Sequence, residues 1–395
     1  MAGAGDVTRL GVVSTHPIQY QVPWFGALAA DPLLDLHVGY GYLPDARAQG
    51  VGFGTAFEWD LPLLDGYRST ELARRNAQPQ LSTFLGIRLR NVADWLHAQR
   101  FDALVVTGWN SYALVQAALA ARRLGLPLLV RGDSNDLRRR SLPARLFHRT
   151  FLRFFDAFLV VGKSNRRFYR RSSVPESKLF DCPHFVDNER LARQHAEALP
   201  RRAERRYGWG IPADAVCALF AGKLVEVKNL PELFAALRLA VARTPRLHLL
   251  VAGEGPLGGE LRATATRERL PVTFAGFLNQ SEIPAAYAAA DFLVLPSHSE
   301  TWGLVVNEAM ACGLPAIVSD GVGCAEDLVE PGVTGFVYRA GSAEELAARL
   351  VAMTGDDEAR RAMGERARQR VLACYSVERA VEGTLAALRA VGALH

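Results

Sequence analysis

Two glutamates with seven residues between them stand out in the stretch SHSETWGLVVNEAMACGLP, residues 297–315. Glu300 follows a short apolar run that is typical of a strand, and Glu308 lies in the helix-like run after it. The N–H groups of Gly303 and the two residues after it would be free where that helix begins, a place that favours phosphate. A carboxylate such as Glu308 accepts two hydrogen bonds in parallel, which suits a ribose diol. The segment therefore predicts a clamp for a nucleotide that carries a polar group.

Each glutamate taken alone also has a structural explanation. Glu300 would be an acid at a helix start, favoured by the helix dipole, and Glu308 would lie on a solvated helix face. The combination of two carboxylates with an anion-binding helix end favours the ligand hypothesis.

Two lysines follow another strand-like run, VCALFAG. Lys223 comes immediately after it, and Lys228 lies just ahead of a helix that opens at Pro231. Positive charge at these positions would stabilise a departing diphosphate. A lone lysine is far more often an ordinary surface residue than a ligand, so the hypothesis depends on the placement at a strand end. No DxD sequence lies convincingly at a strand end, and we therefore expect no metal ion.

Short apolar runs rich in β-branched residues alternate with helix-length amphipathic stretches along the whole chain. The expected strands are RLGVVST, LDLHVGY, FDALVVTG, PLLVRGD, AFLVVGK, KLFDCP, VCALFAGK, LHLLVAGE, VTFAGF, DFLVLPS, PAIVSD and TGFVY. Continuous apolarity indicates strands buried on both faces of a parallel sheet, and the alternation indicates two sets of βαβ units. We expect two doubly wound α/β domains, with ligands beyond the carboxyl ends of the strands where the strand order switches.

The length of 395 residues also favours two domains, and 49% hydrophobic with 22% charged residues is typical of a soluble globular protein. No apolar run approaches the ~18 residues of a membrane span, and the N-terminus is a poor signal peptide. Five scattered cysteines without metal-ligand spacing fit a reducing compartment. We therefore expect a cytoplasmic protein.

Positive charge is concentrated in residues 138–171, where ten Arg and one Lys accompany a single acid, while the remainder of the chain is net negative. Arg145, Arg149 and Arg153 recur every four residues, so they share one helix face. We favour an ordinary amphipathic helix with its aromatics on the sheet and its arginines in solvent. A peripheral contact with an anionic membrane, at its inner face, stays open. No nucleic-acid-binding motif accompanies the charge.

The stretch with the two glutamates resembles the E-x7-E signature of the retaining GT-B glycosyltransferases of family 4. The likeness includes the aromatic-Gly pair after the first Glu, the N-E-A-M run and the later G-x-P. FAGKLVEVKNLPEL resembles the family's G-[RK]-L-x3-K segment, LLVAGEGP its G-x-G-P turn, and VTFAGFLNQSEIPAAYAAADFLVLPS the approach to E-x7-E. STHPIQYQVPWF and AFLVVGKSNRRFYRRSSVPESKLFDCPHFVDNERL resemble one subgroup. The resemblance spans nearly the whole chain, specific in its C-terminal half and looser before residue 150.

The resemblance implies a role for each matching residue. Glu300 would contact hydroxyls of the transferred sugar, and Glu308 would bind the ribose. Lys223 and Lys228 correspond to an Arg and a Lys that neutralise the diphosphate, so at Lys223 a point charge replaces a bidentate guanidinium. Phe277 falls where the family's backbone meets the base. The implied donor-binding residues are Gly222, Lys223, Lys228, Gly253, Phe277, Gly303, Leu304, Val305 and Glu308.

The fold implied by the resemblance is GT-B, two Rossmann-like domains facing across a cleft. We expect an acceptor-binding domain at 1–190, a linker at 191–213 and a nucleotide-sugar-binding domain at 214–375. A final helix at 376–395 would cross back to the first domain.

The acceptor side departs from the family pattern. Many members carry a His after a strand of the first domain, whereas the matching stretch here, VVTGWNSY, has Trp109 and Asn110. His16, at the end of the first expected strand, is a candidate for the same space, and a structural histidine is the alternative. Asp133, at the end of PLLVRGD, is a further catalytic candidate, for which a helix cap or turn acid fits at least as well.

Together these features predict transfer of a sugar from a nucleoside-diphosphate sugar, UDP preferred to GDP, to a hydroxyl of a glycan, lipid-linked glycan or secondary metabolite. The catalytic candidates are Glu300, Lys228, His16 and Asp133. The family's retaining members are thought to let the acceptor attack on the face that the diphosphate leaves, so no glycosidase-like pair of carboxylates is needed. We expect no cofactor, no metal, and a monomer or homodimer.

Two other functions stay open. A nucleotide-sugar epimerase with the GT-B fold would bind its nucleotide similarly but would need no acceptor pocket. A non-catalytic relic would bind a nucleotide sugar without transferring it. GEGPLG, Gly253 to Gly258, also matches a dinucleotide-binding G-x-G-x-x-G, but Pro256 and the lack of a clear acidic partner favour a turn.

Overall fold

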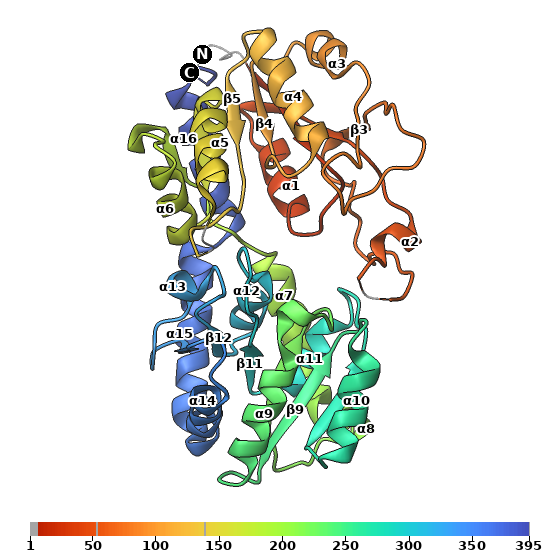
Figure 1. The fold of residues 1–395 in the computed structure, drawn as a ribbon, viewed down its shortest axis with the longest axis vertical. Coiled ribbons are helices and arrows are strands. Elements are labelled where there is room, and N and C mark those ends of the chain that lie inside the picture. Colours follow the sequence, from red (N-terminus) through yellow and green to blue (C-terminus); the bar gives the residue numbers. More distant parts are fainter. Residues whose placement is uncertain (1–6, 53, 138–139, 395) are drawn as a thin grey trace. The chain divides into compact units, whose positions relative to one another are not determined.

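The computed structural model describes residues 7–52, 54–137 and 140–394, so Arg138 and Arg139 of the basic segment lie outside the described residues. The chain divides into two compact units, which we describe separately (Figure 1). The first unit comprises Met1–Ala48, Pro62–His184 and Val377–His395, and the second comprises Gln49–Leu61 and Phe185–Ser376.

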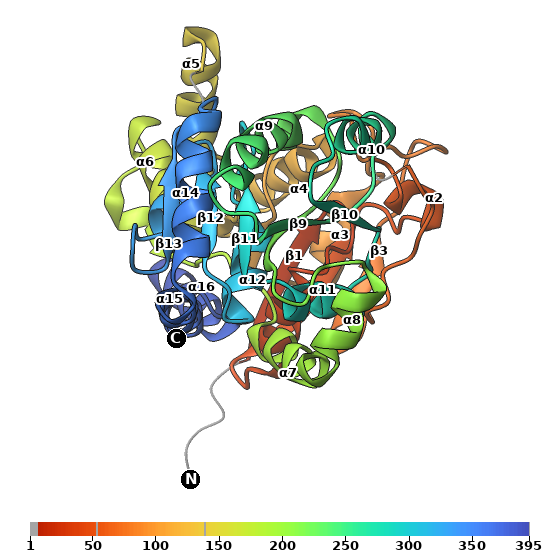
Figure 2. The same ribbon diagram turned by 90° about the horizontal axis from the view of Figure 1, so that it is seen from below.

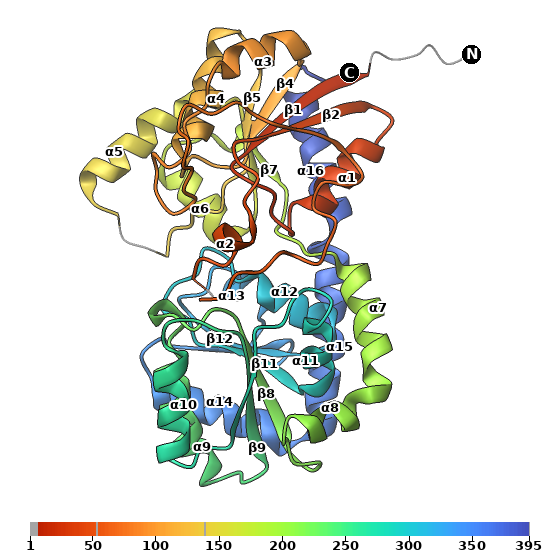
Figure 3. The ribbon, with the colours of Figure 1, turned by 90° about the vertical axis from the view of Figure 1, so that its right-hand side faces the viewer.

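The first unit is built, within its described residues, on a seven-stranded parallel sheet of order β3-β2-β1-β4-β5-β6-β7. The strands are β1 (Thr8–Ser14), β2 (Leu34–Tyr40), β3 (Arg68–Glu71), β4 (Ala103–Val106), β5 (Leu128–Val130), β6 (Ala157–Val160) and β7 (Leu179–Asp181). The helices are α1 (Val22–Ala30), α2 (Ala46–Gln49), α3 (Val92–Gln99), α4 (Tyr112–Arg123), α5 (Leu142–Phe151), α6 (Lys163–Arg171) and α16 (Val377–Ala390), with 3-10 turns at Leu152–Phe154 and Glu176–Lys178. Helices α1 and α16 cover one face of the sheet and α3 and α4 the other (Figure 3). The strand order switches between β1 and β4.

The strands expected from apolar runs are present in this sheet because helices cover both faces. Every residue of β4 is buried, as the continuous apolarity of ALVV requires. Strand β3 was not expected from the sequence. It is the polar run RSTE at the sheet edge, mostly exposed, and it pairs in parallel with β2. An edge strand needs only one backbone partner and no apolar side chains, so hydrophobic periodicity does not reveal it.

Helix α16 returns the end of the chain to the first unit, against β6, β7 and α1. The Trp24 indole N–H donates to the hydroxyl of Thr384 over 3.2 Å. Gly383 allows the close approach, because a Cβ there would lie 1.8 Å from the backbone oxygen of Asp181 at the end of β7. Any larger residue would push the helix off the sheet.

The second unit is built on a six-stranded parallel sheet of order β10-β9-β8-β11-β12-β13. Its strands are β8 (Val216–Ala221), β9 (Leu247–Ala252), β10 (Val272–Gly276), β11 (Phe292–Leu295), β12 (Ala316–Ser319) and β13 (Gly335–Tyr338). Its helices are α7 (Asn188–Ala198), α8 (Arg202–Gly208), α9 (Leu230–Val241), α10 (Gly258–Arg267), α11 (Ile283–Ala289), α12 (Leu304–Ala311), α13 (Ala325–Leu328), α14 (Ala343–Gly355) and α15 (Asp357–Cys374), with 3-10 turns at Leu199–Arg201 and Glu226–Lys228. In Figure 2, α9 and α10 lie on one side of this sheet and α7, α8 and α11 on the other. The strand order switches between β8 and β11.

Residues 191–213, expected to form a linker, are largely helical and belong to the second unit. The guanidinium groups of Arg202 and Arg206 both bind the carboxylate of Asp291, at 2.8 and 2.6 Å, just before β11. These two arginines thus hold α8 on the sheet. The chain instead passes between the units after Ala48, Leu61, His184 and Ser376.

Helix α5 in the basic segment only partly fits the expected amphipathic helix. Phe151 is buried and packs on the first unit, as expected. Leu146 and Phe147 are 66% and 56% exposed, and Leu142 is 75% exposed, so the expectation that the aromatics lie on the sheet is wrong for Phe147. Figure 3 shows α5 extending away from α4 and α6 of the same unit. None of the described helices combines the length and the apolarity that crossing a bilayer requires.

Candidate active site

The loops after β8 and β11 meet at the strand-order switch of the second sheet, where an open α/β sheet binds its ligand. The backbone N–H of His298 donates to the oxygen of Val227 over 2.9 Å and ties the two loops together. Lys228, which ends the short 3-10 turn after β8, thereby reaches Glu300 after β11, and the two side chains form an ion pair. Two residues predicted as catalytic candidates therefore lie side by side.

Two further contacts fix the Glu300 carboxylate at the rim of the sheet. The hydroxyl of Ser297 donates to Oε1 of Glu300 over 3.0 Å. The backbone N–H of Glu300 donates over 3.0 Å to the oxygen of Gly321, in the loop after β12. Glu300 is therefore held by neighbours from three loops before any ligand is present.

Lys223 lies two residues after the end of β8 and near Lys228. Burial, and then the charge of Lys228, lower the pKa of the Lys223 ammonium. Two cations that disfavour each other are stabilised when an anion binds between or beside them. The Lys223 Nζ donates to the backbone oxygen of Val51 over 2.9 Å, a partner that no sequence pattern indicates.

The N-terminus of α12 has the geometry expected for an anion site. Gly303 precedes the helix with φ of 101°, a left-handed conformation that favours glycine. Leu304 and Val305 are the first two helical residues, and the N–H groups of a first helical turn have no intrahelical acceptor. The buried Trp302 indole donates to Oδ1 of Asn307 over 2.8 Å and fixes the turn. The aromatic residue of the motif is therefore a support, a role that sequence reasoning missed.

Glu308 lies inside the unit and not on a solvated helix face, so that alternative is wrong. It is 4% exposed, and its Oε2 accepts a hydrogen bond of 2.5 Å from the hydroxyl of Tyr287 in α11. The hydroxyl fixes the orientation of the carboxylate. A fixed carboxylate near a helix N-terminus suits recognition of a diol.

Two glycines bring three strand ends close together. Gly253, after β9, has φ of 143°, and a Cβ there would lie 1.9 Å from the backbone oxygen of Gly222 after β8. The N–H of Gly222 donates to Ala252 over 3.0 Å, and the N–H of Gly253 donates to Gly276, at the end of β10, over 2.7 Å. GEGPLG is thus a turn that hydrogen-bonds to Leu224, and helix α10 begins at its last residue, Gly258.

Phe277 follows β10 and marks the predicted base side of the site. Its ring centroid lies 4.4 Å from that of Phe57. Phe57 comes from Gln49–Leu61, the segment of the N-terminal half that packs with the second unit.

The acceptor-side candidates lie in the first unit, after different strands. His16 follows β1, its Nδ1 lies 2.9 Å from the Thr15 hydroxyl, and burial lowers the pKa of its imidazole to about 4. The Thr107 hydroxyl, after β4, donates to that of Ser14 over 3.1 Å, which joins the loops at the strand-order switch. Asp133, after β5, is exposed and is no helix cap, since α5 begins after Ser141.

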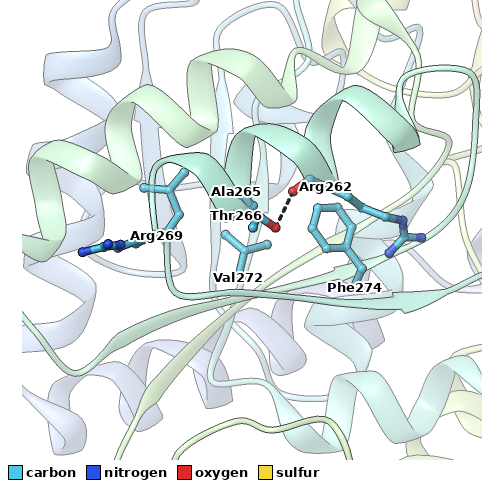
Figure 4. Close-up of a pocket in the computed structure, with 7 residues that line it drawn as sticks. Arg262, Ala265, Thr266, Arg269, Val272 and Phe274 are labelled. Atoms are coloured by element: carbon cyan, nitrogen blue, oxygen red, sulfur yellow. Dashed lines mark hydrogen bonds between the residues drawn. The ribbon is translucent and has the colours of Figure 1, made fainter.

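A surface hollow of about 430 Å³ lies beside edge strand β10 and α10 (Figure 4). The Arg262 guanidinium lies over the Phe274 ring at 4.5 Å and pairs with Glu254, while the Thr266 hydroxyl donates to the backbone oxygen of Arg262 over 3.0 Å. None of the predicted site residues lines this hollow. In the part of the chain that the structure describes, no group of three or more His, Cys, Asp or Glu side chains is placed to hold a metal ion.

Comparison with known proteins identifies two family models along the chain. Residues 201–370 match the model of glycosyl transferases group 1, and residues 54–180 match that of the glycosyl transferase 4-like domain. The sulfoquinovosyl transferase of Arabidopsis thaliana is 35% identical over 34% of this chain and 26% of its own length. The alpha-D-kanosaminyltransferase of Streptomyces kanamyceticus is 25% identical over 69% of this chain and 73% of its own length.

The chain spans less than half of some curated relatives. The D-inositol 3-phosphate glycosyltransferase of Saccharomonospora viridis, for example, is 34% identical over 42% of this chain and 41% of its own length.

Solved structures match the fold over almost the entire chain. HepE of Anabaena, crystallised with UDP and glucose, superposes with a TM-score of 0.72 at 20% identity, over 97% of this chain and 99% of that one. Sucrose-phosphate synthase of Thermosynechococcus elongatus gives a TM-score of 0.71 at 19% identity, over 98% of this chain and 100% of that one. The two family models, the two parallel sheets and the E-x7-E segment agree, and the chain belongs to glycosyltransferase family 4 (group 1), the retaining class with the GT-B fold.

Proposed function

We propose that this protein transfers a sugar from UDP-sugar to a hydroxyl acceptor with retention of configuration and without a metal ion. The observation that carries the proposal is the Lys228–Glu300 pair at the strand-order switch of the second sheet, with Lys223 beside it. UDP is preferred as the nucleotide because HepE, which has the same fold, was crystallised with UDP and with UDP-glucose.

Each site residue of the second unit binds one part of the donor. Lys223 and Lys228 neutralise the diphosphate, assisted by the N–H groups of Gly303, Leu304 and Val305. Glu300 binds hydroxyls of the sugar, and the fixed carboxylate of Glu308 binds the ribose. Before the donor arrives Lys228 and Glu300 bind each other. Phosphate and sugar hydroxyls replace those contacts, so neither charge is left without a counterpart.

Two lysines and a helix N-terminus also supply the charge that a divalent cation supplies in other transferases. Negative charge develops on the departing diphosphate as the bond from the sugar to the phosphate oxygen breaks. Fixed positive groups aimed at that oxygen stabilise it without reorganisation. This is the physical basis for proposing that transfer is independent of metal.

The first unit binds the acceptor in this proposal. The bond from the acceptor oxygen to the sugar forms on the face that the diphosphate leaves, and the acceptor proton passes to a phosphate oxygen. His16 is neutral near pH 7, because burial lowers its pKa to about 4, so it orients a hydroxyl by hydrogen bonding. Asp133 is a second acceptor contact, since it is exposed in the loop after β5.

Thermal unfolding with UDP, GDP, ADP, dTDP and NAD, each with and without Mg²⁺, tests donor binding. A ligand at ~100 times its Kd adds about 2.7 kcal/mol of stability, which a melting curve resolves. We expect a shift with UDP that Mg²⁺ does not change. A shift with NAD alone would contradict the proposal, and so would UDP binding that requires Mg²⁺.

Product analysis separates a transferase from an epimerase or a relic. With a library of UDP-sugars and hydroxyl acceptors, we expect UDP release that depends on an acceptor and that Glu300→Gln lowers by at least ~10²-fold. Conversion of one UDP-sugar to its epimer would identify an epimerase. UDP-sugar binding with neither reaction, across the library, would identify a relic.

We also propose that α5 places the protein peripherally on an anionic membrane. Leu142, Leu146 and Phe147 expose apolar surface on the same short helix as the exposed Arg145 and Arg149. Apolar side chains that enter a headgroup layer and arginines that bind its phosphates are the two components of interfacial binding.

Sedimentation with vesicles tests this contact. We expect binding to phosphatidylglycerol vesicles at low salt, weaker binding at high salt, and none to pure phosphatidylcholine. Leu146→Ser with Phe147→Ser should abolish sedimentation, whereas Leu239→Ser, at an apolar residue 45% exposed in α9, should not. Equal sedimentation of all variants, or of none including the wild type, would contradict the contact.

A further inference from the structure

Part of the N-terminal half of the chain is built into the donor-binding unit. The strap, which we define as residues 49–52 and 54–61, is the orange-red loop that follows α2 in Figure 1. Its neighbours in sequence on both sides belong to the first unit, yet the strap packs with the second.

Polar contacts clip the far end of the strap onto the loop after β10. The side-chain amide of Asn279 donates to the backbone oxygen of Glu58 over 2.7 Å. The carboxylate of Asp60 accepts hydrogen bonds from the backbone N–H of Ser281, at 3.1 Å, and from its hydroxyl. This loop begins at Phe277, the residue predicted to lie at the base.

Aromatic contacts extend the clip towards the base side. The Phe57 ring lies 4.4 Å from Phe277 and 4.8 Å, edge to face, from Trp59. The strap also closes on itself, since the N–H of Trp59 donates to Oε1 of Gln49 over 3.1 Å. These contacts make the strap a folded element that presents Phe57 beside the base-binding loop.

The near end of the strap reaches the diphosphate site. The oxygen of Val51 accepts a hydrogen bond from the Lys223 ammonium, which has three N–H donors. A long, rotamer-rich side chain that is oriented beforehand loses less conformational entropy when its ligand binds.

We propose that the strap is a working part of the donor site, in which it positions Lys223 for the diphosphate and places Phe57 as a wall on the base side at Phe277. The inference rests on the proposed function, because it deepens the same site. Lys223 contacts the donor, and Asp60 acts only through the strap, as a positioning residue.

Calorimetric titration of UDP and UMP tests this role. In Asp60→Ala the strap loses its clip, so UDP should bind at least about fivefold more weakly and the preference for UDP over UMP should fall. Asp60→Asn keeps an acceptor for Ser281 and should restore binding. Asp65→Ala removes an exposed acid five residues further on and is the matched control.

A double-variant cycle with Lys223→Ala isolates the positioning effect. If the strap acts through Lys223, adding Asp60→Ala to Lys223→Ala weakens UDP only by the loss that Asp60→Ala alone causes for UMP, the part that comes from Phe57. Additive losses, or equal losses for UDP and UMP, would show a general effect on the fold and overturn the proposal. Phe57→Ala should weaken UDP and UMP alike, because it removes the wall at the base.

Hydrogen exchange of peptides from the strap makes each outcome decisive. UDP should slow their exchange in the wild type, and Asp60→Ala with Phe57→Ala should accelerate it. Unchanged UDP binding in that double variant overturns the strap proposal, whether or not its exchange rate changes. Failure of the wild type to bind any nucleoside diphosphate would instead contradict the proposed function.

Discussion

The two parallel sheets place different chemistry at the same position, the carboxyl edge where the strand order switches. In the second sheet this edge carries the charged groups Lys223, Lys228 and Glu300, and two of them already form an ion pair. In the first sheet it carries the hydroxyls of Ser14 and Thr107 and an imidazole that burial keeps neutral. The same architecture therefore provides one charged edge and one neutral edge, which we propose bind a diphosphate and a hydroxyl, respectively.

The strongest test of this difference removes from the charged edge the carboxylate that we propose binds the sugar. Glu300→Gln should lower kcat by ~10²–10³-fold, the usual cost of losing one transition-state contact. UDP affinity should change by less than about threefold, because in the proposed site Glu300 binds the sugar and not the nucleotide. Steady-state transfer assays and UDP titration measure both, with the exposed Glu344→Gln in α14 as control. A loss of UDP affinity equal to the loss of rate would place Glu300 elsewhere in the site.

Gly253, in the turns below the charged edge, should tolerate no substitution that adds a side chain. Gly253→Ala forces a Cβ to within 1.9 Å of the Gly222 oxygen at a φ of 143° and should cost about 2–4 kcal/mol of unfolding free energy. Gly259→Ala, in α10 with nothing within 4 Å of its Cβ, should be neutral or stabilising. Denaturant titration compares the two. Equal stabilities would show that the turns can move apart.

Charge at the second edge should decide nucleotide affinity. Lys223→Ala should weaken UDP about tenfold, equivalent to ~1.4 kcal/mol, and the loss should shrink as salt rises. Lys163→Ala, in α6 of the first unit, is a control of equal charge. Calorimetric titration at two salt concentrations is sufficient. A loss of UDP affinity that does not depend on salt would indicate that Lys223 supports the fold and not the phosphate.

The buried His16 of the neutral edge should make the unfolding free energy depend on pH. Burial lowers the His16 pKa from 6.5 to about 4, so below pH 6.5 the unfolded chain binds a proton that the folded chain does not. The stability that neutral His16 contributes is complete above pH 6.5 and is lost as pH falls towards 4. Between pH 6.5 and 4, the unfolding free energy of His16→Gln, obtained from melting curves, should therefore fall by about 1 kcal/mol less than that of the wild type. This figure allows for the partial exposure of His16. Identical slopes for both proteins would remove this role.

The charged edge was largely predictable from the sequence, because each of its elements is local. The run DFLVLPS predicts β11, and α12 begins after Gly303, as the following motif predicts. The spacing of Glu300 and Glu308 then places one carboxylate in a loop and the other in a helix. The burial of Glu308 was not predictable, since it depends on Tyr287 of a different helix.

The strap and the edge strand β3 escaped prediction for a different reason. In residues 54–61, GTAFEWDL, the alternation of apolar and polar side chains in FEWDL is typical of a strand, yet no strand forms there. The contact between Val51 and Lys223 uses a backbone oxygen that any residue would supply. Segments held by backbone contacts and by pairings between distant parts of the chain leave little signal in local hydrophobic patterns.

The division of the chain also has a consequence for engineering chimeras of this family. A donor half exchanged by a single junction near His184 would carry a foreign 277–281 loop against the native strap, and would replace α16, which the first unit needs. A working exchange must therefore move Gln49–Leu61 together with Phe185–Ser376 and must leave Val377–His395 in place. In the proposed site, donor specificity would thus be encoded in two separate pieces of the gene.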